Sequence, residues 1–318
     1  MSNPTALGNP RISVVVPVYG CAGCLDILCD RLKQCLASLT SRFEIILVDD
    51  RSPDNAWPVI AELQLQHPEV RGIRLSRNFG QHIAITAGLA AVQGDYAVVM
   101  DCDLQDPPEI IPKIFAKLNE GYDLVLARRA KRTHSGFRLL AAKAYFGLIS
   151  RFTEENIDGS YGTFSMLSRK VIDAFLQFGE RERHYLFILR WLGFRIGRID
   201  YEHQQRTIGH SAYSLTRLIR HAVDGILFQA TVLLRWIVGM GLLFAAFGAG
   251  LAIFYIYQYF MHSSYPGWTS LVVLILICTG TILTSLGVIG LYVGKIFDQA
   301  KSRPLYLIDT ILDRQNPW

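Results

Sequence analysis

The sequence lacks the features that mark several common protein classes. No Gly-x-Gly-x-x-Gly follows its first strand-like run, which argues against a dinucleotide-binding oxidoreductase. Its formal charge of +5 is modest and its arginines are scattered among acidic residues, so binding of nucleic acid is not expected. A secretory signal is also missing, because the N-terminus is polar and the apolar run Ile12–Val18 is too short for one. We therefore expect the N-terminal domain to stay in the cytosol.

The chain of 318 residues has only six cysteines, and this number does not suggest a disulfide framework in a cytosolic protein. Cys21 and Cys24 have the spacing of a redox or zinc motif and lie where a strand turns into a helix. No second pair completes a zinc site, and Cys29 and Cys35 fall at helical spacing as packing residues. The sequence therefore predicts no zinc site and leaves a redox role for Cys21 and Cys24 open.

Apolar residues make up 51% of the chain, and the excess is concentrated near its C-terminal end. The runs Val232–Phe260 and Trp268–Val293 both exceed the roughly twenty apolar residues that a membrane-spanning helix needs. The loop Met261–Gly267 between them contains no lysine or arginine, whereas basic residues flank the other ends: Arg217, Arg220, Lys295, Lys301 and Arg303. The positive-inside rule then predicts a transmembrane hairpin with both termini in the cytosol.

The first half of the chain alternates between strand and helix patterns. The strand-like runs are nearly all apolar, as parallel strands buried on both faces are; they are Ile12–Val18, Phe43–Val48, Gly72–Leu75, Tyr96–Met100 and Leu124–Ala127. Helical patterns lie between them, at Leu25–Leu39, Asn55–Gln66, His82–Val92 and Glu109–Asn119. This alternation predicts an α/β domain with a mostly parallel sheet covered on both faces. A mixed segment from Arg128 to His203 follows.

The patterns divide the chain into four parts. Residues 1–210 are expected to form the cytosolic α/β domain, and residues 232–295 the transmembrane hairpin. Between them, residues 211–231 are expected to form an amphipathic helix, and its position directly before an apolar run favours the membrane interface. Residues 296–318 are expected to be a cytosolic tail.

Acidic residues follow two of the expected strands. Asp49 and Asp50 end the second, and Asp101 and Asp103 end the fourth. Ligands of parallel α/β sheets collect at the carboxyl ends of the strands. Because Mg²⁺ prefers one or two carboxylates together with phosphate oxygens, this edge of the sheet is a candidate site for a divalent cation and a diphosphate.

Four motifs, in this order and spacing, resemble the inverting family-two glycosyltransferases: Val14-Val15-Val16-Pro17-Val18-Tyr19, Val48-Asp49-Asp50-Arg51-Ser52, Ser76-Arg77-Asn78-Phe79-Gly80 and Asp101-x-Asp-Leu-Gln-Asp-Pro-Pro-Glu109. Within that family the chain resembles the polyprenyl-phosphate branch, which includes dolichyl-phosphate mannose synthases and bacterial bactoprenol glucosyl transferases. The resemblance covers nearly the whole chain, including both C-terminal apolar runs. The Leu-Gln-Asp-Pro-Pro-Glu extension is far more specific than Asp-x-Asp alone.

The resemblance implies a nucleotide-sugar-binding α/β domain of the GT-A type, followed by an amphipathic interfacial helix and two transmembrane helices. It implies that Asp101 approaches the sugar and ribose, and that Asp103 and Gln105 approach the diphosphate and a Mg²⁺ or Mn²⁺ ion. The residues it places at the nucleotide-sugar are Pro17, Tyr19, Asp49, Asp50 and Arg77. It also implies a multi-pass protein of the inner (plasma) membrane.

The acceptor implied by the resemblance is a polyprenyl phosphate, which is already ionised at neutral pH. Catalysis then needs no strong general base and can rest on positioning and charge stabilisation, with inversion at the anomeric carbon. Cations must screen the two anionic substrates from one another. Arg128 and Arg206, the latter before the turn that contains Ser211, are the candidates.

Three departures from the family pattern leave questions open. Tyr19-Gly20-Cys21 stands where Tyr-Asn-Glu is common, so one expected carboxylate is missing. Ser211-Ala212-Tyr213-Ser214 stands where many members have Ser-Lys-Tyr-Ser, and His210 is left open as a substitute for the lysine. Asp158 either fills the place of the family's aspartate before the glycine or has no role.

Two other functions compete with this interpretation. A processive polysaccharide synthase would share the domain, but Phe187-Ile188-Leu189-Arg190-Trp191 lacks the glutamine of the usual motif and two spans are too few for a channel. A non-catalytic membrane scaffold would leave the acidic residues unexplained. UDP-glucose is the preferred donor by similarity alone, and glycines in the apolar runs favour a homo-oligomer of unknown number.

Overall fold

The computed structural model describes residues 9–129, 161–181, 183–202 and 268–313, together with scattered residues between 241 and 261. The chain divides into two compact units. The first comprises Met1–Leu139, Asp158–Ala212 and Pro304–Trp318, and the second comprises Leu140–Ile157 and Tyr213–Arg303. The acidic strand ends predicted from the sequence all belong to the first unit.

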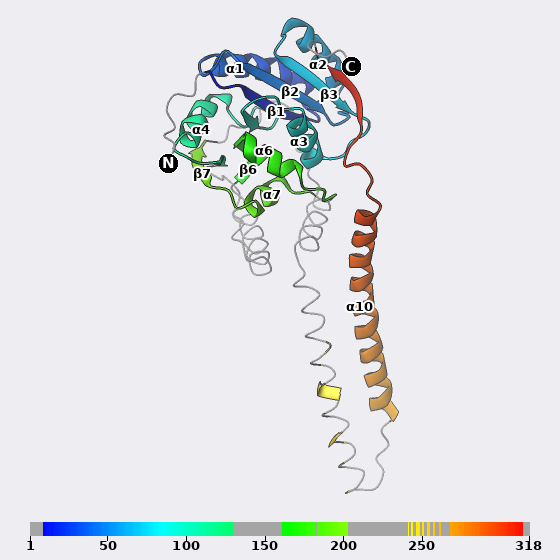
Figure 1. Ribbon diagram of the computed structural model, residues 1–318. Coiled ribbons are helices and arrows are strands. Elements are labelled where there is room, and N and C mark those ends of the chain that lie inside the picture. The colour runs from blue at the N-terminus through cyan, green and yellow to red at the C-terminus, as the bar shows by residue number, and fades with distance from the viewer. Residues whose placement is uncertain are drawn as a thin grey trace. The chain divides into compact units, whose positions relative to one another are not determined.

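The described residues of the first unit form an eight-stranded sheet in the order β7-β5-β6-β4-β1-β2-β3-β8 (Figure 1). Four of its seven strand pairs are parallel, which confirms the expected mostly parallel sheet. The strands that the sequence predicts are β1 Ile12–Val18, β2 Phe43–Asp49, β3 Val70–Leu75, β4 Tyr96–Val99 and β5 Leu124–Arg129.

Helices cover both faces of this sheet because the central strands are apolar on both sides. On β1, Val14 and Val16 belong to one buried cluster, while Val15 belongs to the other. Gly88 of α3 lies so close to β1 that a Cβ there would be 2.3 Å from Val15 Cγ1. The first cluster contains residues of α1 Leu25–Ala37, α2 Ala56–Gln66 and α4 Ile111–Leu118; the second contains α3 Gln81–Ala90, α6 Arg169–Leu176 and α7 Tyr185–Trp191.

Three strands were not predicted from the sequence. β6 Tyr161–Ser168 inserts antiparallel between β4 and β5, and β7 Ile196–Tyr201 pairs parallel with β5. β8 Ile308–Leu312, from the expected C-terminal tail, pairs antiparallel with β3 at the sheet edge. Insertion of β6 matters for the site because it places Thr163 beside the end of β4.

Ion pairs fasten the C-terminal strand to the sheet. Arg71 of β3 lies 2.7 Å from Glu44 and 2.9 Å from Asp313, and the three side chains are 15%, 4% and 7% exposed. Arg51 and Asp309 form a second pair at 2.9 Å, with both side chains 43% exposed. Removing one partner of a buried ion pair destabilises a protein far more than removing one partner of an exposed pair, so Arg71 should contribute more than Arg51 to holding β8 on the sheet.

In the second unit, α10 runs from Trp268 to Ala300. Its stretch Ile277–Ala300 has a mean hydropathy of 1.7, is not buried by other parts of the protein, and is long enough to cross a bilayer. It is the single helix of this kind within the described ranges. The amphipathic helix expected at 211–231 lies outside those ranges, as does most of the first apolar run. The two-helix hairpin and the packing of its glycines between protomers therefore stay predictions.

Candidate active site

Two buried aspartates mark the carboxyl end of β2. The Asp49 carboxylate accepts a hydrogen bond of 2.8 Å from the Ser52 backbone N–H and pairs with Arg74 Nε at 3.3 Å. Burial raises the pKa of Asp49, against the opposing effects of this hydrogen bond and of Arg74. Asp49 is therefore held in place at the strand end by its own turn and by a cation from β3.

Asp50 positions the loop between β3 and α3. Its carboxylate accepts hydrogen bonds from the backbone N–H groups of Phe79, at 2.7 Å, and Gly80, at 2.8 Å. Gly80 adopts a φ of +94°, which glycine reaches without strain. Arg77 in the same loop is exposed, with its guanidinium 4.3 Å from the centre of the Phe79 ring. Asp50 thus fixes the loop that carries Arg77 and leads into α3.

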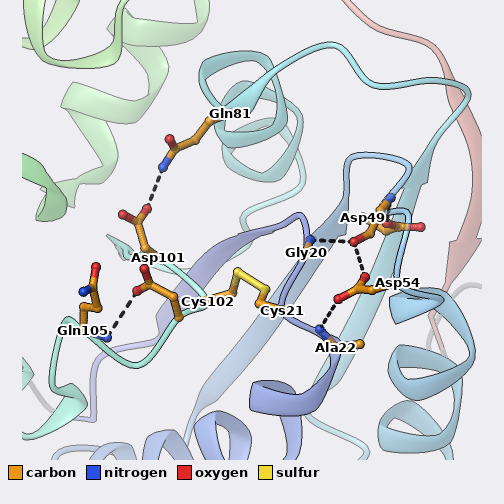
Figure 2. Close-up of a disulfide and its surroundings, with 11 residues drawn as sticks. Gly20, Cys21, Ala22, Asp49, Asp54, Gln81, Asp101, Cys102 and Gln105 are labelled. Atoms are coloured by element: carbon orange, nitrogen blue, oxygen red, sulfur yellow. Dashed lines mark hydrogen bonds between the residues drawn. A yellow bond between two sulfur atoms is a disulfide. The ribbon is translucent and has the colours of Figure 1, made fainter. Parts of the chain in front are cut away.

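Two donors hold Asp101 at the end of β4. Gln81, the first residue of α3, donates to Asp101 Oδ1 at 2.6 Å, and Figure 2 shows its amide directed at that carboxylate. Thr163 of β6 donates to the same oxygen at 2.8 Å. Burial and the nearby Asp106 raise the pKa of Asp101, opposed by the Thr163 hydrogen bond. Elements from three parts of the sequence therefore converge on one carboxylate.

The loop after Asp101 alternates between half-buried polar and buried apolar residues. Asp101, Asp103 and Gln105 are half-buried, while Cys102 and Leu104 are buried. Leu104 adopts a φ of +61°, a strained conformation for a non-glycine residue of the kind found at functional sites. The turn brings the Gln105 backbone N–H to 3.2 Å from Asp103 Oδ1.

Asp103 and Gln105 offer oxygen donors suited to Mg²⁺ or Mn²⁺. A carboxylate and an amide oxygen on one tight turn are hard ligands, and such ions complete their coordination with phosphate oxygens and water. Among the residues described, no group of three or more His, Cys, Asp and Glu side chains could hold a metal by itself. The residues present fit a cation that is shared with a bound diphosphate.

Sequence reasoning missed a buried group behind the acidic loop. Asp106 is fully buried, accepts a hydrogen bond from the Tyr201 hydroxyl, and lies 3.7 Å from the Arg129 guanidinium. Arg129 also donates to the Tyr201 hydroxyl at 3.3 Å, and its charge acts on Asp101. Asp106 lies in the motif Asp101-x-Asp-Leu-Gln-Asp-Pro-Pro-Glu109, so the sequence contained a signal that could have identified it. The sequence contained no such signal for Arg129, because its neighbour Arg128 is equally basic.

Arg128 and Arg129 differ in their surroundings because they are consecutive in β5. Arg128 forms a two-pronged pair with Asp200 at 2.6 and 2.8 Å, and both side chains are about half exposed. Arg129 is on the opposite side of the strand and approaches the acidic cluster. Arg129 is therefore the arginine that approaches the acidic cluster, at Asp106, while the role of Arg128 in screening the substrates stays a prediction.

The structure joins Cys21 to Cys102 in a disulfide, with the two Cα atoms 6.3 Å apart (Figure 2). The sequence analysis expected no disulfide and weighed Cys21 with Cys24, so both the bond and the partner correct it. Cys29 and Cys35 are buried in α1, which confirms them as packing residues. The disulfide links the loop after β1 to the middle of Asp101-Cys102-Asp103.

The remaining predicted residues are partly placed. Pro17 is buried in β1, and Tyr19 directly after the strand is 53% exposed, available to a ligand at the sheet edge. Asp158, Arg206, His210 and Ser211 lie outside the described residues, so their roles stay predictions.

Comparison with known proteins agrees with this geometry. The family model described as Glycosyl transferase family 2 matches residues 13–176, which contain β1 except its first residue, all of β2 to β6, and every acidic residue of the site. The chain is a family 2 glycosyltransferase. Its fold is the α/β GT-A fold expected from the sequence motifs.

Relatives of this glycosyltransferase match it over nearly its full length. It is 36% identical over 302 residues to the uncharacterized glycosyltransferase YkcC of Bacillus subtilis, covering 94% of this chain and 93% of the relative. It is 33% identical over 312 residues to an undecaprenyl-phosphate 4-deoxy-4-formamido-L-arabinose transferase of Proteus mirabilis, covering 96% and 95%. Such relatedness extends beyond the α/β domain.

Solved structures share the fold of this glycosyltransferase. The glucosyl-3-phosphoglycerate synthase of Mycobacterium tuberculosis, in complex with Mn²⁺, UDP and phosphoglyceric acid, superposes with a TM-score of 0.50 at 18% identity. The match covers 69% of this chain and 78% of that one. At this identity the likeness establishes the fold alone.

Proposed function

We propose that this glycosyltransferase moves one sugar from a nucleotide-sugar to a polyprenyl phosphate, with inversion at the anomeric carbon. The observation that supports a polyprenyl-phosphate acceptor is the 33% identity, over 96% of this chain, to a transferase named for undecaprenyl phosphate. A match of that extent includes most of the apolar helix α10. The acceptor would therefore be an anionic lipid handled at a membrane surface.

The acidic strand ends support the donor side of this proposal. Asp49 would lie near the base and ribose, and Asp101, held by Gln81 and Thr163, would accept hydrogen bonds from sugar or ribose hydroxyls. Asp103 and Gln105 would hold Mg²⁺ or Mn²⁺, which neutralises the charge that grows on the departing nucleoside diphosphate. The exposed Tyr19 offers an aromatic face next to the same strand ends.

Transfer would be a single in-line displacement. A phosphate oxygen of the acceptor forms the new bond to the anomeric carbon as the bond to the donor diphosphate breaks, and no proton has to be removed first. Positioning and charge stabilisation would then supply the rate enhancement. Arg129, 3.7 Å from Asp106 and close enough for its charge to act on Asp101, would be a cation that screens the two anionic substrates. We propose UDP-glucose as the first donor to test.

The proposed acceptor also implies association with the membrane. Helix α10 would anchor the protein, and the expected hairpin would keep the α/β domain on the cytosolic side of the inner membrane. An α/β domain on the external side of the membrane would be separated from cytosolic nucleotide-sugars.

The test is sugar transfer by the purified full-length protein. UDP- and GDP-sugars with a radiolabel would be offered with undecaprenyl phosphate, with and without Mg²⁺ or Mn²⁺, and organic-extractable label counted. We expect metal-dependent labelling from one donor. Asp103→Asn should abolish it, whereas Asp173→Asn, which changes an exposed carboxylate of α6, should not. Absence of label from every donor with folded protein would overturn the proposal.

A further inference from the structure

The Cys21–Cys102 disulfide joins two loops that have different tasks in the proposed function. Cys21 lies in the loop after β1, two residues beyond Tyr19, and Cys102 lies between Asp101 and Asp103 (Figure 2). Their side chains are 6% and 7% exposed, so both are buried against the domain. The bond therefore couples the nucleotide side of the site to the proposed metal loop.

The loop that carries Cys21 is fixed on both sides of the cysteine. The Gly20 backbone N–H donates to Ser52 Oγ at 2.7 Å, and the Ala22 backbone N–H donates to Asp54 Oδ2 at 2.7 Å. The Cys21 carbonyl accepts from the Cys24 backbone N–H at 3.0 Å. Cys21 is therefore an anchored point.

The loop that carries Cys102 is held differently at its two ends. Asp101 is tied by Gln81 and Thr163, and the backbone N–H of Met100 still bonds to β1 at 3.2 Å. The Asp103 carboxylate accepts from Gln105, a bond within the same loop. The disulfide adds a covalent tie between the middle of this loop, at Cys102, and the anchored loop after β1.

We propose that Cys21 and Cys102 are a redox-active dithiol pair that tunes binding of the metal and nucleotide at the Asp101–Gln105 loop. The reaction partner is a small-molecule disulfide, RSSR. One cysteine thiolate attacks RSSR and releases RS⁻, and the second thiolate attacks the mixed disulfide and releases another RS⁻. Two protein thiols thus become one disulfide, two RSH form, and two electrons pass from the protein to RSSR.

The proposed cytosolic setting explains why such a bond would be regulatory. Thiol-reducing systems keep structural disulfides rare there, and those that form are mostly transient or redox-sensing. Cys29 and Cys35 of α1 are buried as well and form no disulfide, so they serve as controls for the pair. Burial raises the pKa of Cys29 to about 12 and that of Cys35 to about 11.

Reduction should weaken binding because the cross-link then no longer fixes the Asp101–Gln105 loop against the loop after β1, and that alignment has to be restored when the ligand binds. Fixing the backbone of one residue corresponds to about a five- to thirtyfold change in affinity. Binding and redox state are reciprocally linked, so bound ligand must shift the reduction equilibrium by the same factor. This inference rests on the proposed function for the identity of the ligand and for the cytosolic setting.

The experiment uses the purified full-length protein. Oxidised and TCEP-reduced forms would be titrated with Mn²⁺ and UDP or GDP by calorimetry. In parallel, the protein would be equilibrated in glutathione buffers of graded ratio, with and without Mn²⁺ and nucleotide, and the Cys21–Cys102 linkage quantified by differential alkylation and mass spectrometry. Cys21→Ala and Cys102→Ala should bind like the reduced protein in every buffer. Cys29→Ala is the matched control and should keep the redox response.

We expect tighter binding in the oxidised form and an equal shift of the glutathione midpoint. Equal affinity in both forms, or binding in neither, overturns the coupling. Failure of Cys21 and Cys102 to pair under oxidising buffer overturns the redox site itself. Neither readout uses sugar transfer, so a wrong acceptor or sugar in the proposed function would leave these results unaffected.

Discussion

Removal of the Thr163 hydroxyl tests the assignment of Asp101 most directly. Thr163 donates to Asp101 Oδ1 at 2.8 Å from a buried position on β6, and Gln81 donates to the same oxygen at 2.6 Å. Thr163→Val removes the donor with little change of shape. A hydrogen bond to a charged group contributes about 1.5–3 kcal/mol, which corresponds to about ten- to a hundredfold in rate. Because Gln81 remains, we expect a loss near the lower end, about tenfold in kcat/KM.

A double-mutant cycle and a conservative variant sharpen this test. Thr163→Ser keeps a hydroxyl and should retain most of the activity. Gln81→Leu with Thr163→Val leaves the carboxylate without either donor, so the combined loss should exceed the product of the single losses. Sugar transfer gives kcat/KM, and thermal unfolding shows whether each variant folds. Wild-type activity in Thr163→Val, or equal losses in the valine and serine variants, would refute the reasoning.

Three further predictions concern stability and topology. Arg71→Met should lower the free energy of unfolding, measured by urea titration, by about 3–5 kcal/mol because it leaves two carboxylates buried without this arginine. Arg51→Met, at an exposed pair, should lower it by less than about 1 kcal/mol. Similar losses in the two variants would contradict this expectation. Burial, with His82 and Arg190 nearby, lowers the pKa of His184 to about 3, so stability is full above pH 6.5 and falls by at most about 1.4 kcal/mol per pH unit below it. His184→Phe should remove that slope between pH 7 and 5, and an unchanged slope would count against it. Ser264→Cys should react with an impermeant thiol reagent on intact cells, compared with the parent chain; labelling only after permeabilisation would reverse the expected topology.

The central strands and the helices between them were predictable because their signals are local. An apolar run such as Ile12–Val18 can only be buried on both faces, and β1 is buried at all seven positions. Asp49 ends β2 and Asp101 follows β4, and both strands lie parallel to β1 on either side of it, so the strand order brings the two residues to one edge. Sequence periodicity therefore sufficed for both the layers and the place of the site.

The parts that were not predicted depend on pairing between distant segments. β6 pairs with β4 across more than sixty residues, and β8 pairs with β3 from beyond the apolar runs. A short stretch of sequence carries no signal for either pairing, because the partner of an antiparallel strand is set by which sheet edge is still open to hydrogen bonding. The same holds for Arg129, whose difference from Arg128 arises only once β7 pairs with β5 and takes Arg128 to Asp200.

The Cys21–Cys102 pair depends both on a local sequence pattern and on contact between distant segments. In Asp101-Cys102-Asp103-Leu104-Gln105 the ligand-type residues alternate with buried ones, so the middle position of Asp-x-Asp points into the domain. A motif defined by its alternate residues leaves that inner position open to any side chain that packs. In this chain the inner position is cysteine, and it is bonded to Cys21, which stands where the resemblance drawn from the sequence motifs implies glutamate. The inner position of the motif thus ties the Asp101–Gln105 loop to the loop after β1.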